Sequence, residues 1–334
     1  MNFEWHWLPG RKNLIRLSHA TGANGQRSGC LKLLFLLLAV LPLAQVACAE
    51  SPPGSFAYIL QADSFAPSKP AAVERFAACG RDWIVLDAVF GSGLPWERAD
   101  IDAIRNRKPG RKVIAYISIG EAEDYRPYWR KEWKLPSDKP GWLGDENPEW
   151  KGNYRVKYWQ PGWQRLILAA VDDAMASGFD GVYLDIVDGF ETFEQEGKDF
   201  IDDRVNPETK QSYRRDMVDW VKAIAARARM KKPAALVIPQ NGSQLLAHPD
   251  FLEIISAIGI EDLFTNGNKL QPEMETSGRL GHLKKMAEAK KPVLLIEYPK
   301  SAERQALVEK MAEANGMVWL VTDRQLKSLG TSGR

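Results

Sequence analysis

Three acidic residues each close a short apolar run: Asp185, Glu261 and Glu297. Apolar runs of this length are typical of strands that are buried on both faces of a parallel sheet. An acid directly after such a strand lies at the carboxyl edge of the sheet, where barrel enzymes carry their catalytic groups. Burying a charged carboxylate costs free energy unless it is paired or used. The repeated pattern therefore predicts one acidic site assembled from distant segments.

Two of these acids have the setting that glycosidic bond cleavage requires. Side-chain alternation places Tyr183 and Asp185 on one face of the first strand, and Glu261 closes another. Glycoside hydrolysis uses two carboxyl groups that flank the bond, one ionised and the other able to donate a proton. The alternative for each acid is a structural role, bound to neighbouring backbone amides. We predict that Asp185 and Glu261 form the catalytic pair.

Further polar and aromatic residues lie in or just after the predicted strands, or in a long aromatic loop that spans 120–160. Any one of them alone could instead be a helix cap, a packed residue or a solvated group. Together, the acids among them would surround the site with negative charge, which favours a cationic ligand such as an unacetylated amino sugar. The predicted substrate-binding residues are Asp87, Tyr116, Glu121, Trp159, Tyr183, Asp188, Asn241 and Glu297.

Strand and helix signals alternate along the chain after residue 55. Between the strands lie helical patterns at 161–178, from Asn206 onward, at 274–290 and at 302–315, with proline or glycine at several of their ends. Eight strands with intervening helices predict an α/β fold, a (β/α)8 TIM-type barrel in a single domain. A doubly wound open sheet is the alternative. The predicted strands are 56–60, 83–88, 112–118, 181–187, 235–239, 257–261, 292–297 and 316–321.

The N-terminal segment 1–49 has the features of an export signal. A basic region ends at Lys32, an apolar run follows, and Ala47-Cys48-Ala49 fits the cleavage rule for small residues. We therefore expect a periplasmic or extracellular protein with no stable membrane span after processing. A retained anchor and a lipoprotein modified at Cys48 are the alternatives. The glycosidase domain is then expected at 50–327, followed by a flexible tail at 328–334.

Other chemistries have little support in the sequence. A formal net charge of +2 gives no basic face for nucleic acid. No G-x-S-x-G motif is present, and after cleavage only His248 and His282 remain, which disfavours a serine hydrolase and a zinc site. We predict neither a metal nor a cofactor, although an all-carboxylate site for Ca²⁺ or Mg²⁺ stays an alternative.

Five segments give the chain a family resemblance. It resembles glycoside hydrolase family 114, the endo-α-1,4-polygalactosaminidase group, and is more distantly similar to the hydrolase domain of the Pel-polysaccharide processing enzymes. The segments appear in the family's order, and the resemblance covers roughly residues 55–325. They are 115–129 (AYISIGEAEDYRPYW), 158–164 (YWQPGWQ), 181–188 (GVYLDIVD), 239–242 (PQNG) and 259–264 (GIEDLF).

The resemblance implies a (β/α)8 barrel that cleaves an α-1,4-linked galactosamine or N-acetylgalactosamine polysaccharide. By motif match it implies that Asp185 is the nucleophile and Glu261 the acid/base, with retention of configuration. The apolar neighbours of Glu261 would raise its pKa and suit a proton donor, while Asp185 would stay ionised. A non-catalytic saccharide-binding barrel and a glycosidase for a different bond are the alternative functions.

Overall fold

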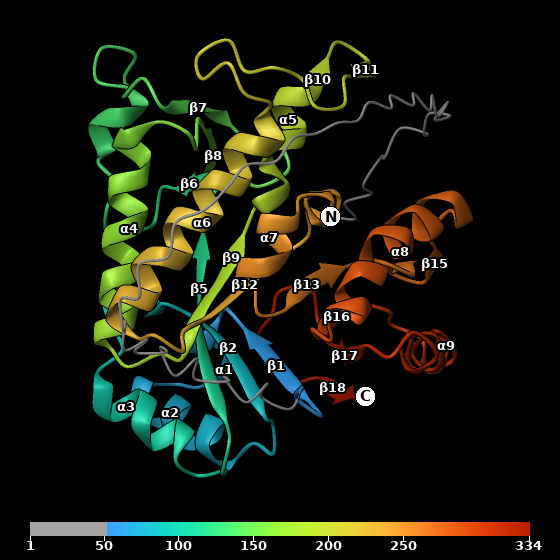
Figure 1. The fold of residues 1–334 in the computed structure, drawn as a ribbon. Helices are drawn as coiled ribbons and strands as arrows, with labels where there is room; N and C mark the ends of the chain where they lie inside the picture. Colours follow the sequence, from blue (N-terminus) through green and yellow to red (C-terminus); the bar gives the residue numbers. More distant parts are fainter. Residues whose placement is uncertain (1–51) are drawn as a thin grey trace, which may run out of the picture. The chain divides into compact units, whose positions relative to one another are not determined.

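The computed structural model describes residues 52–334, drawn as the coloured part of the ribbon in Figure 1. The predicted export segment and the lipid attachment at Cys48 lie outside the described residues. Within the described part of the chain, no helix is both long and apolar enough to cross a membrane.

The first five predicted strands form one parallel sheet. Each strand pairs with the next along the chain, and the register aligns Tyr116 with Tyr183 on neighbouring strands. The order is β1 (Phe56–Ile59), β2 (Trp83–Asp87), β5 (Lys112–Ser118), β9 (Gly181–Asp185) and β12 (Leu236–Pro239).

The last three predicted strands pair in parallel in a second sheet, which β18 extends in the antiparallel sense. One parallel bridge, Gln240 with Gly259, joins the two sheets on one side. On the other side, the Phe56 amide donates to Ser332 Oγ of β18 at 2.9 Å. The predicted strands thus all form, but they are divided between two sheets. The second sheet contains β13 (Ile258–Glu261), β16 (Val293–Glu297), β17 (Val318–Val321) and β18 (Thr331–Gly333).

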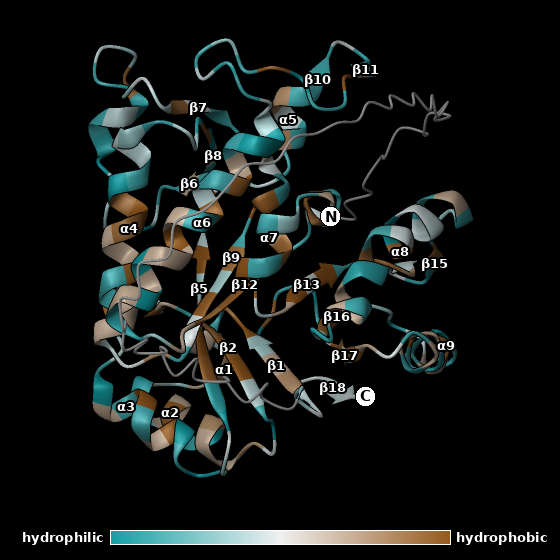
Figure 2. Ribbon diagram, in the orientation of Figure 1, coloured by the Kyte–Doolittle hydropathy of each residue, from teal (hydrophilic) through white to brown (hydrophobic). Residues whose placement is uncertain are grey.

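Two apolar cores lie on opposite faces of the strands. The inner core collects side chains from seven of the parallel strands and from Ala257, which precedes β13. Tyr58, Tyr116 and Tyr183 lie at its polar end, with ring centroids 6.2 Å apart for Tyr58–Tyr116 and 5.1 Å apart for Tyr58–Tyr183. The outer core lies between strands and helices. Figure 2 shows mostly hydrophobic strands beside helices that carry hydrophilic faces.

Four of the longer helices form where the sequence predicts them, with one correction to a starting residue. Helix α4 begins at Pro161, whereas α6 begins after Ser212 rather than at Asn206. Asn206 instead donates to Asp216 Oδ2 at 2.7 Å, and its backbone amide donates to the Gln211 carbonyl at 2.7 Å, which closes a turn ahead of the helix. The predicted helices are α4 (Pro161–Ala176), α6 (Tyr213–Lys231), α8 (Glu273–Glu288) and α9 (Ala302–Ala314). Helices α2 (Lys69–Ala78) and α3 (Arg98–Arg105) form as well, in segments for which no helix was predicted.

The long aromatic loop carries a three-stranded antiparallel sheet, β6-β8-β7. Its tryptophans mostly pack on one another and on α4: Trp142 lies 5.2 Å from Trp163, and Trp133 lies 5.4 Å from Trp129, between ring centroids. This loop contains β6 (Glu121–Glu123), a 3₁₀ helix (Lys131–Lys134), β7 (Leu143–Glu146) and β8 (Asn153–Val156).

The remaining elements are short and mostly lie in the connections. They are α1 (Ala62–Phe65), β3 (Val89–Phe90), β4 (Leu94–Pro95), α5 (Glu191–Glu194), β10 (Gln195–Glu196), β11 (Asp199–Phe200), α7 (Pro249–Ile254), β14 (Thr265–Asn266), β15 (Lys269–Leu270) and 3₁₀ helices at Val187–Phe190 and Ser243–Ala247.

The C-terminal segment differs from the prediction of a flexible tail at 328–334. It forms β18, and Arg81 Nη2 donates to the carbonyls of Gly330 at 2.6 Å and Leu329 at 3.2 Å. The small polar residues of this segment give no apolar signal in the sequence. Its order comes from backbone pairing with β17 and from hydrogen bonds to β1 and Arg81.

We expect deletion of 328–334 to lower the free energy of unfolding by about 2–4 kcal/mol, because several hydrogen bonds worth about 1 kcal/mol each are lost. Urea unfolding followed by circular dichroism would measure the change. Deletion of Arg334 alone, which leaves β18 intact, is the control. Equal stability of the long deletion and this control would contradict the role given to β18.

Candidate active site

The three acids that close predicted strands occupy the carboxyl ends of those strands. Asp185 is the last residue of β9, Glu261 of β13 and Glu297 of β16. In parallel strands these ends share one edge, so the chain directions deliver the acids to the same side of the fold.

Two donors hold the Asp185 carboxylate. The Tyr116 hydroxyl donates to Oδ2 at 2.7 Å, and the Ile186 amide donates to Oδ1 at 2.8 Å. Ile186 has a φ of 57°, which is a strained conformation for a β-branched residue. Gly120 makes room for this turn, because a Cβ there would lie 2.2 Å from the Ile186 carbonyl oxygen.

The Glu261 carboxylate has a second tyrosine. The Tyr298 hydroxyl donates to Glu261 Oε1, and the Glu261 amide donates to Asn241 Oδ1 at 3.1 Å. Arg324 lies over the Tyr298 ring, 4.4 Å from its centroid, and forms a two-pronged ion pair with Asp262 at 2.8 and 3.0 Å. These contacts fix Glu261 from its backbone and from its side chain.

The two carboxyl groups interact electrostatically. Burial and then the charge of Glu261 raise the pKa of Asp185 to about 8. Burial, followed by the charge of Asp262, raises the pKa of Glu261, while the Tyr298 hydrogen bond and the nearby Gln240 amide oppose that rise. The charge of Glu261 therefore makes the ionised Asp185 that the sequence predicts costly in the free protein.

Four of the predicted binding residues lie against this pair. Tyr116 donates to Asp185, Asn241 accepts from the Glu261 amide, and the charges of both acids raise the pKa of the buried Tyr183, after burial itself. Burial, the charge of Glu191 and that of Glu261 raise the pKa of Asp188 to about 8.

Two predicted binding acids accept hydrogen bonds from the protein itself. Glu297 is fully buried and accepts from the Phe264 and Thr265 amides at 2.7 and 3.1 Å. Glu121 is 5% exposed and accepts from Asn147 at 2.7 Å and Asn153 at 3.3 Å within the aromatic loop. Their oxygens are engaged by the protein, so the structure favours the structural alternative for both.

Asp87 and Trp159 are engaged elsewhere. Arg126 Nη1 donates to Asp87 Oδ1 at 2.6 Å, and its Nε donates to Glu123 Oε2 at 2.5 Å. Trp159 packs edge-on against Phe193 at 4.9 Å between centroids, and its indole N–H donates to a glutamate. The predicted sugar contacts of both residues stay predictions.

Sequence reasoning missed four residues of the site: Gln240, Tyr298 and Arg324, which act on Glu261, and Arg126, which lies 6.0 Å from the ring centroid of Tyr116. Alternation along β16 would have revealed Tyr298, because it directly follows Glu297 and so lies on the opposite face of the strand. Gln240 was visible only as part of a short motif. The two arginines come from loops, where neither periodicity nor a strand end indicates their position.

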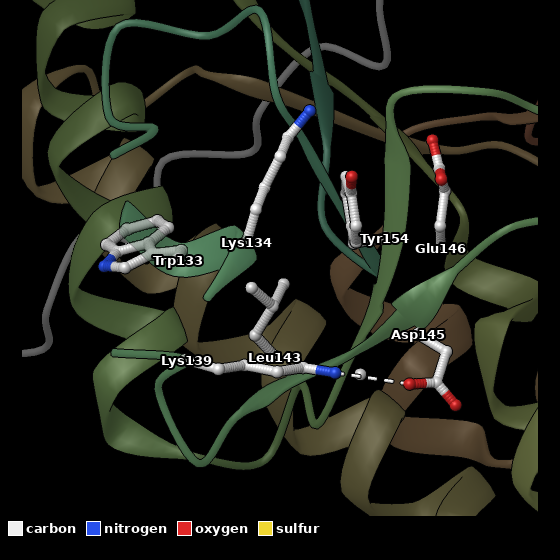
Figure 3. Close-up of a pocket in the computed structure, with 8 residues that line it drawn as sticks. Trp133, Lys134, Lys139, Leu143, Asp145, Glu146 and Tyr154 are labelled. Atoms are coloured by element: carbon white, nitrogen blue, oxygen red, sulfur yellow. Dashed lines mark hydrogen bonds and ion pairs between the residues drawn. The ribbon is translucent and has the colours of Figure 1, made fainter. Parts of the chain in front are cut away.

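Two surface hollows lie along β7. Neither Asp185 nor Glu261 is among the residues that line them. One, of about 230 Å³, includes Trp133, Tyr154 and the Lys139–Asp145 ion pair of 3.2 Å drawn in Figure 3. The other, of about 280 Å³, includes Phe193. Within residues 52–334, no group of three or more His, Cys, Asp or Glu side chains is arranged to hold a metal ion.

Carboxyl groups gathered at the ends of parallel strands are an arrangement that glycoside hydrolysis can use. The comparison with known families agrees. The chain matches the model of glycoside-hydrolase family GH114 over residues 44–333 and belongs to that family, so it is a glycoside hydrolase.

Relatives occur in bacteria and archaea. A protein of Deinococcus radiodurans, described as uncharacterized, is 34% identical over 74% of each chain. The uncharacterized protein MJ1477 of Methanocaldococcus jannaschii is 39% identical over 58% of this chain and 53% of its own length.

Solved structures share the fold at low sequence identity. The glycoside hydrolase domain of PelA from Pseudomonas aeruginosa has a TM-score of 0.62 at 18% identity, covering 84% of this chain and 98% of that one. Ega3 of Aspergillus fumigatus, solved in complex with galactosamine, has a TM-score of 0.58 at 17% identity, covering 82% and 94%.

We expect Asp185→Asn to stabilise the protein increasingly as the pH rises from about 4 toward 8. The pKa of Asp185 is raised in the folded state, so the wild type loses stability across this window as the unfolded chain ionises first. Asparagine removes that loss. Urea unfolding at about pH 4, 6 and 8 measures the difference.

Asp250→Asn is the control of opposite sign. Hydrogen bonds from Arg215 and Lys222 lower the pKa of Asp250, so its ionised form stabilises the fold above the ordinary aspartate pKa. This variant should lose stability at about pH 6–8 and match the wild type only in strong acid. A pH-independent effect of Asp185→Asn would contradict the raised pKa of Asp185.

Proposed function

We propose that this chain is an exported hydrolase of an α-1,4-linked galactosamine or N-acetylgalactosamine polysaccharide. The observation that carries the proposal is the coupling of Asp185 and Glu261 at strand ends, each bound by a tyrosine hydroxyl. Membership of GH114 supports it, as does the similarity in fold to Ega3, whose structure contains galactosamine. The eight parallel strands then form a (β/α)8 barrel whose carboxyl end binds the sugar.

Asp185 and Glu261 divide the chemistry between two steps. In the first, Asp185 attacks the anomeric carbon as the glycosidic bond breaks, and Glu261 gives its proton to the leaving oxygen. In the second, Glu261 takes a proton from water, whose oxygen displaces Asp185 and releases the sugar. Retention of configuration follows, with a carboxyl separation of about 5–5.5 Å expected for this class.

The hydrogen bonds of the site match these roles. Tyr116 and the Ile186 amide both donate to Asp185, which stabilises the ionised nucleophile and aims it. Tyr298 donates to Glu261, which stabilises the carboxylate that remains after its proton has left. Because the charge of Glu261 raises the pKa of Asp185, ionisation of Asp185 is easier while Glu261 carries its proton.

The charge around the pair favours an amino sugar. The charges of Glu191 and Glu261 both raise the pKa of Asp188, after burial itself. An ammonium group would lower the cost of ionising these buried acids, whereas an acetylated nitrogen would not. We therefore expect cleavage to depend on deacetylated residues in the polymer.

We expect Asp185→Asn and Glu261→Gln each to reduce turnover by about 10²–10⁴-fold, because each removes a group that acts in the transition state. The assay incubates partly deacetylated α-1,4-poly-galactosamine with purified protein and reads product masses. Asp145→Asn is the matched control, since this acid is highly exposed and pairs with Lys139 on the surface.

Near-normal turnover by either variant would remove that residue from its role. Binding of the polymer by the wild type with no product would favour the non-catalytic saccharide-binding function. If the protein cleaves only another glycan, it is still a glycoside hydrolase, but the proposed linkage is wrong.

A further inference from the structure

Gln240 carries a buried amide group that the protein does not satisfy. The residue is fully buried just after β12, and its Nε2 has no hydrogen-bond partner within the described residues. Buried donors without partners are rare, because each gives up its bonds to water. Such a group next to a reactive carboxyl calls for a functional explanation.

The amide is held in one orientation. The buried Tyr183 hydroxyl donates to Gln240 Oε1, which identifies Nε2 as the end that is free to donate. Tyr183 contacts Tyr58 and belongs to the inner core, so this anchor rotates little. The oxygen is thus fixed, and the donor end is the part left for another acceptor.

Gly259 brings this amide to the strand that ends in Glu261. Gln240 and Gly259 form the bridge between the two sheets, and a Cβ at Gly259 would lie 1.8 Å from Tyr183 Oη and 2.3 Å from Gln240 Oε1. Glu261 follows two residues later on the same face of β13. The Gln240 side chain therefore occupies the space directly beneath the Glu261 side chain, and it interacts with that carboxyl.

We propose that Gln240 is a positioning residue for Glu261. Tyr183 anchors its amide oxygen, and its Nε2 donates to the Glu261 carboxylate once Glu261 has lost its proton. This inference rests on the proposed function of the site and adds a residue that supports the second step. In that step the ionised Glu261 must accept a proton from water.

Several other groups act on Glu261, and the contribution of Gln240 has to be separated from theirs. The charges of Asp185, Asp188 and Asp262 favour the protonated form of Glu261. The Tyr298 hydroxyl and the charge of Arg324 favour its ionised form, and the buried hydroxyls of Tyr58 and Tyr183 lie within its electrostatic reach. Arg279 donates to the Glu261 carbonyl at 2.7 Å.

The test replaces Gln240 by methionine, which keeps the length of the side chain and removes the amide. Carbon-13 NMR of protein labelled at glutamate Cδ follows the titration of Glu261, whose signal is assigned by its loss in Glu261→Gln. We expect Gln240→Met to raise the pKa of Glu261 by about 1, since a donor to the charged form is lost. Tyr183→Phe, which frees the amide to turn, should give a smaller rise.

The kinetic counterpart uses the same variants and the poly-galactosamine assay. The alkaline limb of kcat/KM, where Glu261 must be protonated, should move to higher pH by the same amount. At lower pH kcat should fall about tenfold with little change in KM, because Glu261 is then a less available base. A loss of activity with an unmoved limb would mark Gln240 as merely structural and overturn the proposal.

The two readouts separate failure of this inference from failure of the function. An inactive wild type that still shows the NMR shift would refute the proposed activity and leave the Gln240–Glu261 interaction standing. If the wild type is active and Glu261 titrates in both variants as it does in the wild type, the interaction alone is refuted. If Gln240→Met does not fold, Tyr183→Phe decides the question by the same measurement.

Discussion

The placement of two half-buried carboxyl groups at one edge of the strands is the constraint on which the site depends. Each is costly to ionise there, and the charge of Glu261 makes Asp185 costlier still. The protein answers mainly with hydrogen-bond donors: Tyr116 and the Ile186 amide bind Asp185, and Tyr298 binds Glu261, while the charge of Arg324 also favours the ionised Glu261. Hydroxyl and amide donors stabilise charge without cancelling it, so both acids stay reactive.

The backbone is shaped by the same requirement. Three residues near the ends of β9, β13 and β12 have left-handed backbone: Ile186 and Asp262 directly follow β9 and β13, and Asn241 follows β12 by two residues, with φ values of 57°, 47° and 59° respectively. This backbone is strained for isoleucine, whereas asparagine and aspartate adopt it more readily. At Ile186 it turns an amide back to Asp185, and at Asn241 it accompanies a side-chain bond to the Glu261 amide. The left-handed backbone at these positions thus helps to orient both carboxyl groups.

The sequence allowed a sound prediction of what depends on regular patterns. All eight strands form near their predicted places, and Asp185 and Glu261 lie at the ends of β9 and β13, because apolar runs and strand ends leave local signals. What it missed depends on tertiary contacts. The bracing role of Glu297 requires knowing that 264–265 folds over β16, and the order of β18 requires knowing its neighbours. Arg126 and Arg324 reach the site from loops, whose course no periodicity predicts.

The titration of Asp185 in the wild type and in Glu261→Gln tests the central claim most directly. Carbon-13 NMR of protein labelled at aspartate Cγ, with the signal assigned by its loss in Asp185→Asn, measures both values. The account predicts a pKa of about 8 for Asp185 in the wild type. It also predicts a clear fall in that pKa when the neighbouring charge is removed. An unchanged titration of Asp185 in Glu261→Gln would show that the two carboxyl groups do not act on one another, and would contradict the account.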